Sequence, residues 1–229
     1  MGRLFFVLLV VGGGVLAWKG WADYALSRGA GEAPEAVTVA ELEQGLPTNR
    51  WRSLGPHEPV VRLATHAEKD GQVLYFLYPV VDEAAWARAK AGPLAKYAGD
   101  VIRMPVAELT AALDIRVLVK TNRYASEAEL NMEWGSGRWP RQDVSGLVVA
   151  ADSSLGKAEL EMLAQILGRF DPNQVVVLEE GRTPSSPWRG LGMMGGGAVL
   201  ALLGFAARVR RWRKRTDDFS STKDERADN

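Results

Sequence analysis

Apolar residues are concentrated at the two ends of the chain. Residues 4–18 include no charged side chain over 15 positions, and residues 191–207 include none over 17. A helix needs about 20 mostly apolar residues to cross roughly 30 Å of hydrocarbon, so both runs are slightly short. Tryptophans beside both runs suit the interface of a membrane. The pattern therefore predicts two transmembrane helices, at residues 1–24 and 188–208.

Lysine and arginine residues near the ends of these runs predict an orientation. Positive side chains tend to stay on the cytoplasmic side of a span, and here they can also contact lipid headgroups. With two spans, both termini are then cytoplasmic and residues 30–182 form an extracytoplasmic domain. This arrangement predicts the bacterial inner (plasma) membrane, with the central domain periplasmic or extracellular. Six basic residues follow the second run: Arg208, Arg210, Arg211, Arg213, Lys214 and Arg215.

Two alternatives to a pair of spans are open. The first run resembles a cleaved signal peptide, because Val15 and Ala17 have the small-residue spacing of a cleavage site. Trp18 and Lys19 directly after it count against cleavage, which would leave the middle of the chain extracytoplasmic in any case. Two buried helices of a soluble core are the other alternative, but charge-free runs of this length are rare there.

Residues 30–182 show short runs typical of strands between short helical patterns. Asp70-Gly71 between two β-rich runs indicates a hairpin. Asp82 and Ser154 are predicted to cap the helices that follow them. We expect an α+β domain with a curled or barrel-like, mostly antiparallel sheet. Strands are predicted at residues 37–39, 50–54, 60–67, 72–81, 101–104, 115–121, 144–150 and 174–178, and helices at 40–44, 82–90, 106–113, 126–133 and 157–167.

Charge is distributed unevenly along the chain. The whole chain has 28 basic and 28 acidic residues, whereas residues 30–187 have 16 and 22, a net charge of −6. An acidic domain repels phosphate polyanions, so we expect no nucleic-acid partner. Residues 209–229 are basic and then polar. Because residues 216–229 include almost no apolar side chains, this segment is predicted to be disordered.

Few residues suggest catalysis or cofactor binding. The chain has no cysteine, and its only histidines, His57 and His66, are too few for a metal site. A dinucleotide-type glycine motif at residues 190–195 lies inside an apolar run, without the strand it would require. Adjacent carboxylates such as Glu179-Glu180 are expected to be solvated. The sequence thus predicts no enzyme, no cofactor and no metal.

Small residues in the second run suggest helix packing. Gly192 and Gly196, and likewise Gly197 and Ala201, are four residues apart, a spacing that lets helix backbones approach closely. Residues 12–14 of the first run are also glycines. We expect the spans to pack through these residues, either with each other or across a homodimer; a high glycine content common to spans in general is the alternative.

Residues 131–141 are the most distinctive segment of the central domain. Tryptophan and arginine side chains among glycines are typical of interface hot spots. The segment therefore predicts contact with a protein partner, and a tryptophan pair buried beneath the sheet is the alternative. The candidate interface residues are Trp134, Arg138, Trp139 and Arg141.

Four short segments resemble a known membrane-protein layout: residues 37–45, 49–55, 117–121 and 144–148. They are similar to two-pass proteins that hold an OB-like β domain outside the membrane, namely the Surfeit-type cytochrome oxidase assembly factors. The mitochondrial membrane-anchored ubiquitin ligases and their bacterial relatives without a RING share this layout. The resemblance implies the architecture only. Ligase activity is not implied, since the RING cysteines are absent, and no functional residue is carried over.

These features predict a two-pass inner-membrane protein whose extracytoplasmic domain binds a membrane or envelope protein, in assembly or envelope maintenance. An extracytoplasmic sensor or ligand-binding domain is the alternative, although a tail of about twenty residues is too short for an output domain. A membrane-anchored hydrolase comes third. That function would require a buried pocket with converging carboxylates.

Overall fold

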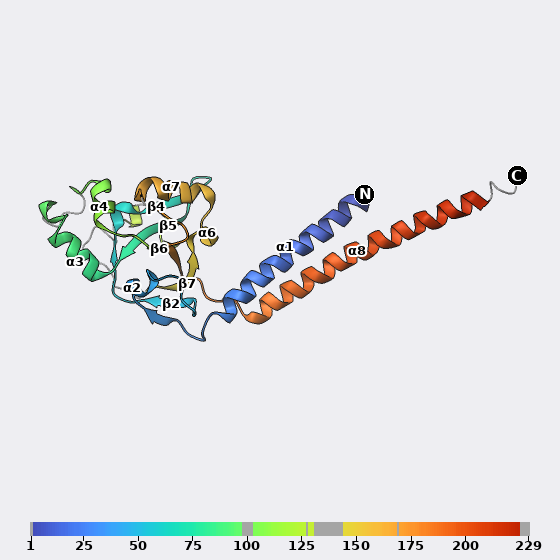
Figure 1. Cartoon of the computed structure of the whole chain (residues 1–229), viewed down its shortest axis with the longest axis horizontal. Helices are drawn as coiled ribbons and strands as arrows, with labels where there is room; N and C mark the ends of the chain where they lie inside the picture. The colour runs from blue at the N-terminus through green and yellow to red at the C-terminus, as the bar shows by residue number, and fades with distance from the viewer. Residues whose placement is uncertain (1, 98–102, 127, 131–143, 169, 225–229) are drawn as a thin grey trace. The chain divides into compact units, whose positions relative to one another are not determined.

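The computed structural model of the chain describes residues 2–97, 103–126, 128–130, 144–168 and 170–224. They fall into two compact units (Figure 1). One unit consists of the N-terminal residues up to Arg28 and the C-terminal residues from Pro184. The other is the central domain, from Gly29 to Thr183.

The first unit is a pair of long helices. Helix α1 spans Gly2–Arg28 and helix α8 spans Pro187–Asp224. At 1.5 Å per residue, the 38 residues of α8 extend about 57 Å, well beyond the thickness of a bilayer core. The helix therefore continues through the basic residues and through part of the segment predicted to be disordered. The sequence from Phe205 to Asp224 has no glycine or proline to end the helix.

The central domain is built on one curled, mixed sheet of eight strands, so the prediction of an α+β domain is confirmed. The strands follow the order β1-β2-β7-β8-β6-β5-β3, and β4 also pairs with β5. Two pairs are parallel, β1 with β2 and β6 with β8, and the other five are antiparallel. Their bounds are β1 Glu35–Val37, β2 Trp51–Leu54, β3 Glu58–Pro59, β4 Thr65–Lys69, β5 Gln72–Val81, β6 Val117–Thr121, β7 Val144–Ala150 and β8 Val176–Glu180.

The hairpin between β4 and β5 forms where the sequence predicts it. Asp70 has φ 54° and Gly71 has φ 78°, the left-handed values of both central residues of a type I′ turn. This turn matches the twist of the flanking strands. It sets the register in which Lys69 pairs with Gln72.

Short helices connect the strands. Asp82 caps α3 as predicted, because its carboxylate accepts hydrogen bonds from the N–H groups of Ala84 and Ala85. The prediction that Ser154 caps α7 is wrong, since Ser154 ends a separate short helix and Gly156 takes the capping position. The bounds are α2 Val39–Leu42, α3 Glu83–Ala91, α4 Val106–Ala112, α6 Ala151–Ser154 and α7 Lys157–Leu167, with 3-10 turns at Val61–Leu63 and Ala95–Tyr97.

Further local predictions differ from the structure. The strand expected at residues 37–39 ends at Val37, and Val39 begins α2. Residues 60–63, expected in a strand, include the 3-10 turn that precedes β4. Of the strand expected at residues 101–104, the first two residues lie outside the described part, and Met104 is not in a strand.

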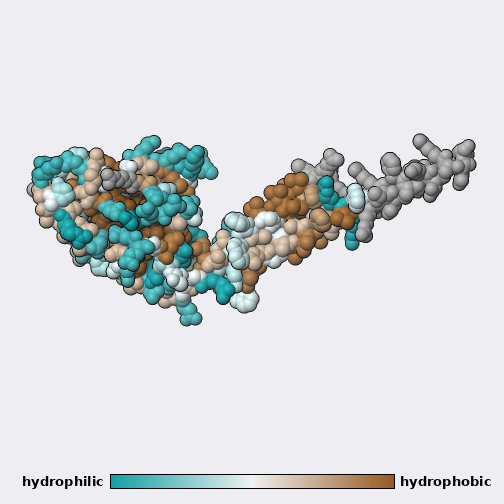
Figure 2. Space-filling view, in the orientation of Figure 1, coloured by the Kyte–Doolittle hydropathy of each residue, from teal (hydrophilic) through white to brown (hydrophobic). Residues whose placement is uncertain are grey.

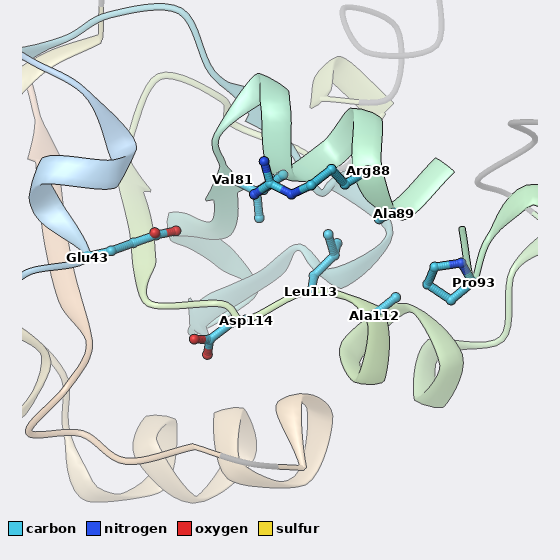
Figure 3. A pocket seen from close by; sticks show the side chains of 9 residues that line it. Glu43, Val81, Arg88, Ala89, Pro93, Ala112, Leu113 and Asp114 are labelled. Atoms are coloured by element: carbon cyan, nitrogen blue, oxygen red, sulfur yellow. The ribbon is translucent and has the colours of Figure 1, made fainter. Parts of the chain in front are cut away.

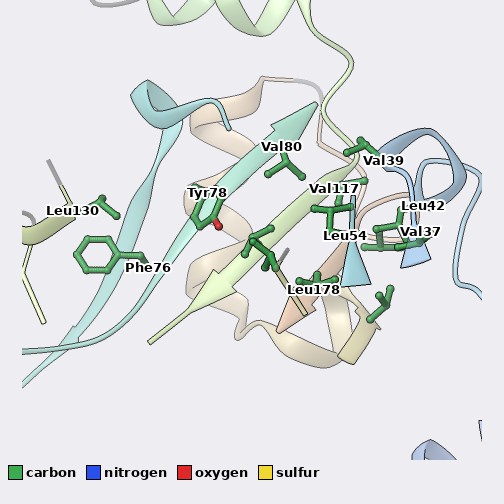
Figure 4. Close-up of a cluster of buried hydrophobic side chains, with 14 residues drawn as sticks. Val37, Val39, Leu42, Leu54, Phe76, Tyr78, Val80, Val117, Leu130 and Leu178 are labelled. Carbon is green, nitrogen blue, oxygen red and sulfur yellow. The ribbon is translucent and has the colours of Figure 1, made fainter. Parts of the chain in front are cut away.

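The hydrophobic core lies on the central strands of the sheet (Figure 4). Strands β6, β7 and β8 lie side by side and are buried along most of their length. Gly146 on β7 permits the close contact with β8, because a Cβ there would collide with the carbonyl group of Glu179. The charged groups described below lie near the ends of these strands and on the segments that connect the strands. The largest fully buried side chains of the central domain include Leu42, Leu54, Phe76, Leu118, Leu147 and Leu178.

Candidate functional site

The two long helices pack through glycines spaced seven residues apart. Gly13 and Gly20 on α1 are buried, and so are Gly190, Gly197 and Gly204 on α8. A seven-residue spacing keeps these positions on one side of a helix, as in a coiled coil. Each helix therefore presents one line of glycines to the other.

Backbone touches backbone along this line. A Cβ built on Gly13 would lie 2.6 Å from the carbonyl oxygen of Gly197, and one built on Gly20 would lie 2.7 Å from that of Gly190. Real Cβ atoms do not approach so closely, so a side chain at either position would push the helices apart. Ala17 and Ala201 lie beside these contacts and leave room for them.

The structure separates the four residues that the sequence suggested for helix packing. Gly197 and Ala201 lie at the contact with α1. Gly192 and Gly196 lie elsewhere on α8, since a Cβ added to either would meet no atom within 4 Å. The four-residue spacing thus located only part of the contact. The seven-residue repeat of Gly190, Gly197 and Gly204 was the signal for the rest.

Large apolar side chains cover the outside of the helix pair. Leu8 on α1 is 63% exposed, and Leu202 on α8 is 67% exposed. Figure 2 shows these apolar surfaces along the described part of the pair. A pair of helices that packs in water instead buries its large apolar side chains and exposes polar ones. Other large apolar side chains exposed on the pair include Phe5, Val11, Val15, Trp18, Trp188, Val199, Leu203 and Phe205.

Both helices are long and apolar enough to cross a membrane. The stretches Phe5–Arg28 and Pro187–Arg210 each have 24 residues and a mean hydropathy of 1.7. Only 11% and 17% of their most apolar windows are buried. A core helix of a soluble protein would instead be mostly buried. The low burial of both helices is consistent with membrane spans.

The basic residues that follow the second apolar run continue α8 as a helix. Arg208 is exposed, and its guanidinium lies 5.0 Å from the centre of the Phe6 ring on α1. Arg210 is also exposed. The side chains of four members of the cluster lie outside the described part: Arg211, Arg213, Lys214 and Arg215.

The candidate interface residues cannot be placed. Trp134, Arg138, Trp139 and Arg141 lie within residues 131–143, outside the described part of the chain. Their role in contact with a partner remains a prediction.

The two histidines occupy structural positions in the central domain. The Nδ1 atom of His57 lies 2.8 Å from the carbonyl oxygen of Gly55, and the ring of His66 lies 5.5 Å from that of Phe76. No group of three or more His, Asp or Glu residues that could hold a metal occurs among the described residues.

A polar cluster fastens helices α6 and α7 to the sheet. The Nζ atom of Lys120 on β6 donates to the carbonyl oxygen of Ser154 at 3.0 Å, and the Ser154 hydroxyl donates to Glu179 at 2.6 Å. Lys120 also lies 4.0 Å from the centre of the Tyr75 ring, whose hydroxyl donates to Glu159. Burial lowers the pKa of Lys120. The prediction that Glu179 is solvated is wrong, because only 14% of its side chain is exposed.

A charged pocket of about 340 Å³ lies at another margin of the sheet (Figure 3). Its charged residues come from three distant parts of the chain: Glu43 at the end of α2, Arg88 on α3, and Asp114 before β6. In Figure 3 the Glu43 carboxylate and the Arg88 guanidinium extend toward the same space. Apolar side chains complete the walls, among them Val81, Ala89 and Leu113.

The electrostatics of the pocket centre on Glu43. Burial raises the pKa of Glu43, and the charges of Asp114 and Asp82 raise it further, while Arg116 and Arg88 oppose this. Asp114 forms an ion pair with Arg116 at 2.8 Å. No local motif links the residues of this pocket, so the sequence alone does not predict it.

No family model, curated protein or solved structure matches this chain. The resemblance to Surfeit-type assembly factors and to relatives of membrane-anchored ubiquitin ligases is therefore still a prediction.

The glycine contact can be tested with neighbouring substitutions on α8. We expect Gly197→Leu to destabilise the helix pair by about 1–3 kcal/mol, the usual cost of overpacking, because its side chain meets the α1 backbone. Gly196→Leu is the matched control, since it enters open space. Energy transfer between fluorophores on Gly12→Cys and Leu202→Cys, followed during SDS titration in micelles, measures the separation of the helices. Equal effects of the two substitutions would contradict this packing.

Proposed function

We propose that this chain is a two-pass membrane protein that holds its central domain on the extracytoplasmic side, where the domain binds a protein partner. One observation carries the proposal: the helix pair buries glycines and exposes large apolar side chains along both of its helices. Lipid is the solvent in which that arrangement is favourable, because close backbone packing holds helices together there and apolar side chains can face the surroundings.

The basic residues support an orientation for this anchor. Arg208 and the five basic residues after it follow the apolar stretch of α8 within eight positions. Such a cluster remains on the cytoplasmic side of a bacterial inner membrane and can contact anionic headgroups. With two spans, both termini then lie in the cytoplasm and residues 30–182 lie in the periplasm or outside the cell.

Contact with a membrane or envelope protein is the role proposed for the central domain. The tryptophans and arginines of residues 134–141 have the composition of interface hot spots. Assembly or maintenance of an envelope complex would use such a tethered binding domain. The anchor keeps the domain at the membrane surface, where a membrane-bound partner is at a high effective concentration.

The absence of native cysteines makes the orientation directly testable. We expect Lys157→Cys, a position 91% exposed on α7, to react with a membrane-impermeant maleimide in intact spheroplasts. Ser221→Cys in the C-terminal tail should react only after lysis, because the proposal places it in the cytoplasm. The reverse labelling pattern would contradict the orientation, and labelling of both sites in intact cells would contradict two spans.

Partner binding can be tested in the same membranes. The full chain, purified in mild detergent, should retain a membrane or envelope protein in stoichiometric amounts. Truncation of a hot-spot residue costs about 2 kcal/mol or more, so Trp134→Ala and Trp139→Ala should each weaken retention by roughly 30-fold. Leu74→Ala, which removes another exposed apolar side chain of the domain, is the control. Retention that is unchanged by either tryptophan substitution would contradict this interface.

A further inference from the structure

The pocket at the margin of the sheet brings opposite charges to one small space. Glu43 and Arg88 line it together, and the charge of Arg88 is close enough to lower the pKa of Glu43. Across the part of the chain that the structure describes, neither side chain has a hydrogen bond or an ion pair. The charge of Asp114 is satisfied by Arg116, with contacts of 2.9 Å and 2.8 Å. Glu43, which is partly buried, and Arg88, which is exposed, are thus the two charged side chains of the pocket without a partner in the described part of the chain.

Keeping Glu43 in this place is unfavourable for the fold itself. A half-buried carboxylate loses hydration, and the nearby carboxylates of Asp114 and Asp82 disfavour its charge. A bound cationic group would compensate for both effects. Groups kept in such destabilising positions within a cavity are typical of binding sites.

The rest of the pocket suits a small organic molecule. Its volume of about 340 Å³ lies at the lower end of the range found for ligand sites. Val81, Ala89 and Leu113 are buried residues that line it and provide an apolar surface. Ala85 and Ala112 have short side chains, which leave the space open.

We propose that this pocket binds a small zwitterion of the amino-acid type, with its ammonium group at Glu43, its carboxylate at Arg88 and a short apolar side chain against Val81 and Leu113. Arginine suits a carboxylate because its guanidinium can donate two parallel hydrogen bonds. The carboxylate of Glu43 is an acceptor for the N–H groups of the ammonium. The proposal concerns the central domain alone and does not depend on the partner or on the orientation in the membrane.

Equilibrium dialysis of radiolabelled L-leucine against the full chain in detergent micelles tests the proposal. Leucine should bind, whereas N-acetylleucine, without the ammonium charge, and leucinamide, without the carboxylate, should bind at least tenfold more weakly. Alanyl-alanine distinguishes a free amino acid from the end of a peptide, and either preference fits the proposed chemistry. No binding of leucine or the dipeptide at 10 mM, or equal binding of leucine and its two singly charged analogues, would overturn it.

Substitutions identify the binding groups. Glu43→Gln and Arg88→Gln should each weaken leucine binding at least tenfold, because each removes one charge and retains polar character. Lys157→Gln and Glu161→Gln, on the exposed face of α7, are matched controls that should bind leucine as the unmodified chain does. Unchanged binding by either pocket variant would overturn the assignment.

Stability provides a second measurement that separates loss of binding from loss of folding. Because the fold raises the pKa of Glu43, the protein is more stable when this carboxyl is protonated. That stability is lost as the pH rises through the pKa of Glu43 in the folded state. Without ligand, Glu43→Gln should therefore melt at or slightly above the unmodified chain at pH 7. This difference should shrink as the pH falls through the unfolded-state pKa of a glutamate, about 4.3, and disappear at about pH 3, where the carboxyl is protonated in the folded and unfolded states. A clearly lower melting temperature at pH 7 would contradict the proposed role of Glu43.

Discussion

Direct contact between two helix backbones determines how this chain is built. Gly13 and Gly20 meet Gly197 and Gly190, and no side chain separates the helices at these points. Close packing of this kind uses the small residues on the inside and leaves the large apolar ones on the outside. In water the exposed leucines, valines and aromatic side chains would favour aggregation, whereas in lipid they need no cover. The glycine contact and the apolar exterior are thus the arrangement that the proposed membrane anchor requires.

The central domain follows the opposite pattern and has the core of a water-soluble protein. Its parallel and antiparallel strands bury a continuous layer of valine and leucine side chains, and polar groups lie at the margins. Lys120, Ser154 and Glu179 fasten the short helices to the sheet through hydrogen bonds. Glu43 and Arg88, by contrast, have been left without such partners in the described part of the chain. This difference separates a structural polar cluster from a candidate binding pocket.

Local sequence signals predicted the features that depend on neighbouring residues. The Asp70-Gly71 hairpin and the cap at Asp82 each depend on a few adjacent positions, and both were predicted correctly. Serine is a common N-cap residue, so the sequence predicts Ser154 as the cap of α7. The cap is Gly156, two residues later, and the Ser154 hydroxyl instead hydrogen-bonds to Glu179 on β8. Polar composition predicts disorder after residue 215, but α8 extends to Asp224 because no glycine or proline interrupts it there.

The contacts between distant segments could not be predicted in the same way. Four-residue spacing identified Gly197 and Ala201, but only the position of α1 distinguishes them from Gly192 and Gly196. Pairing of β5 with β6 brings α3, which follows β5, near Asp114, which precedes β6. Glu43 comes from the end of α2, a distant part of the chain, so the three residues form no pattern in the sequence. Helix length and apolar character are properties of a segment, whereas a site of this kind is a property of the fold.

The exposure of the helix pair to lipid can be measured with nitroxide labels on Leu8→Cys and Leu202→Cys in the full chain, reconstituted into liposomes. Oxygen concentrates in the hydrocarbon and a nickel chelate remains in water, so power-saturation spectra report which solvent surrounds each label. We predict strong relaxation by oxygen and little by the nickel chelate at both positions, and the reverse for a label on Lys157→Cys. Relaxation by the nickel chelate at Leu8 and Leu202 as strong as at Lys157 would contradict a membrane-embedded helix pair.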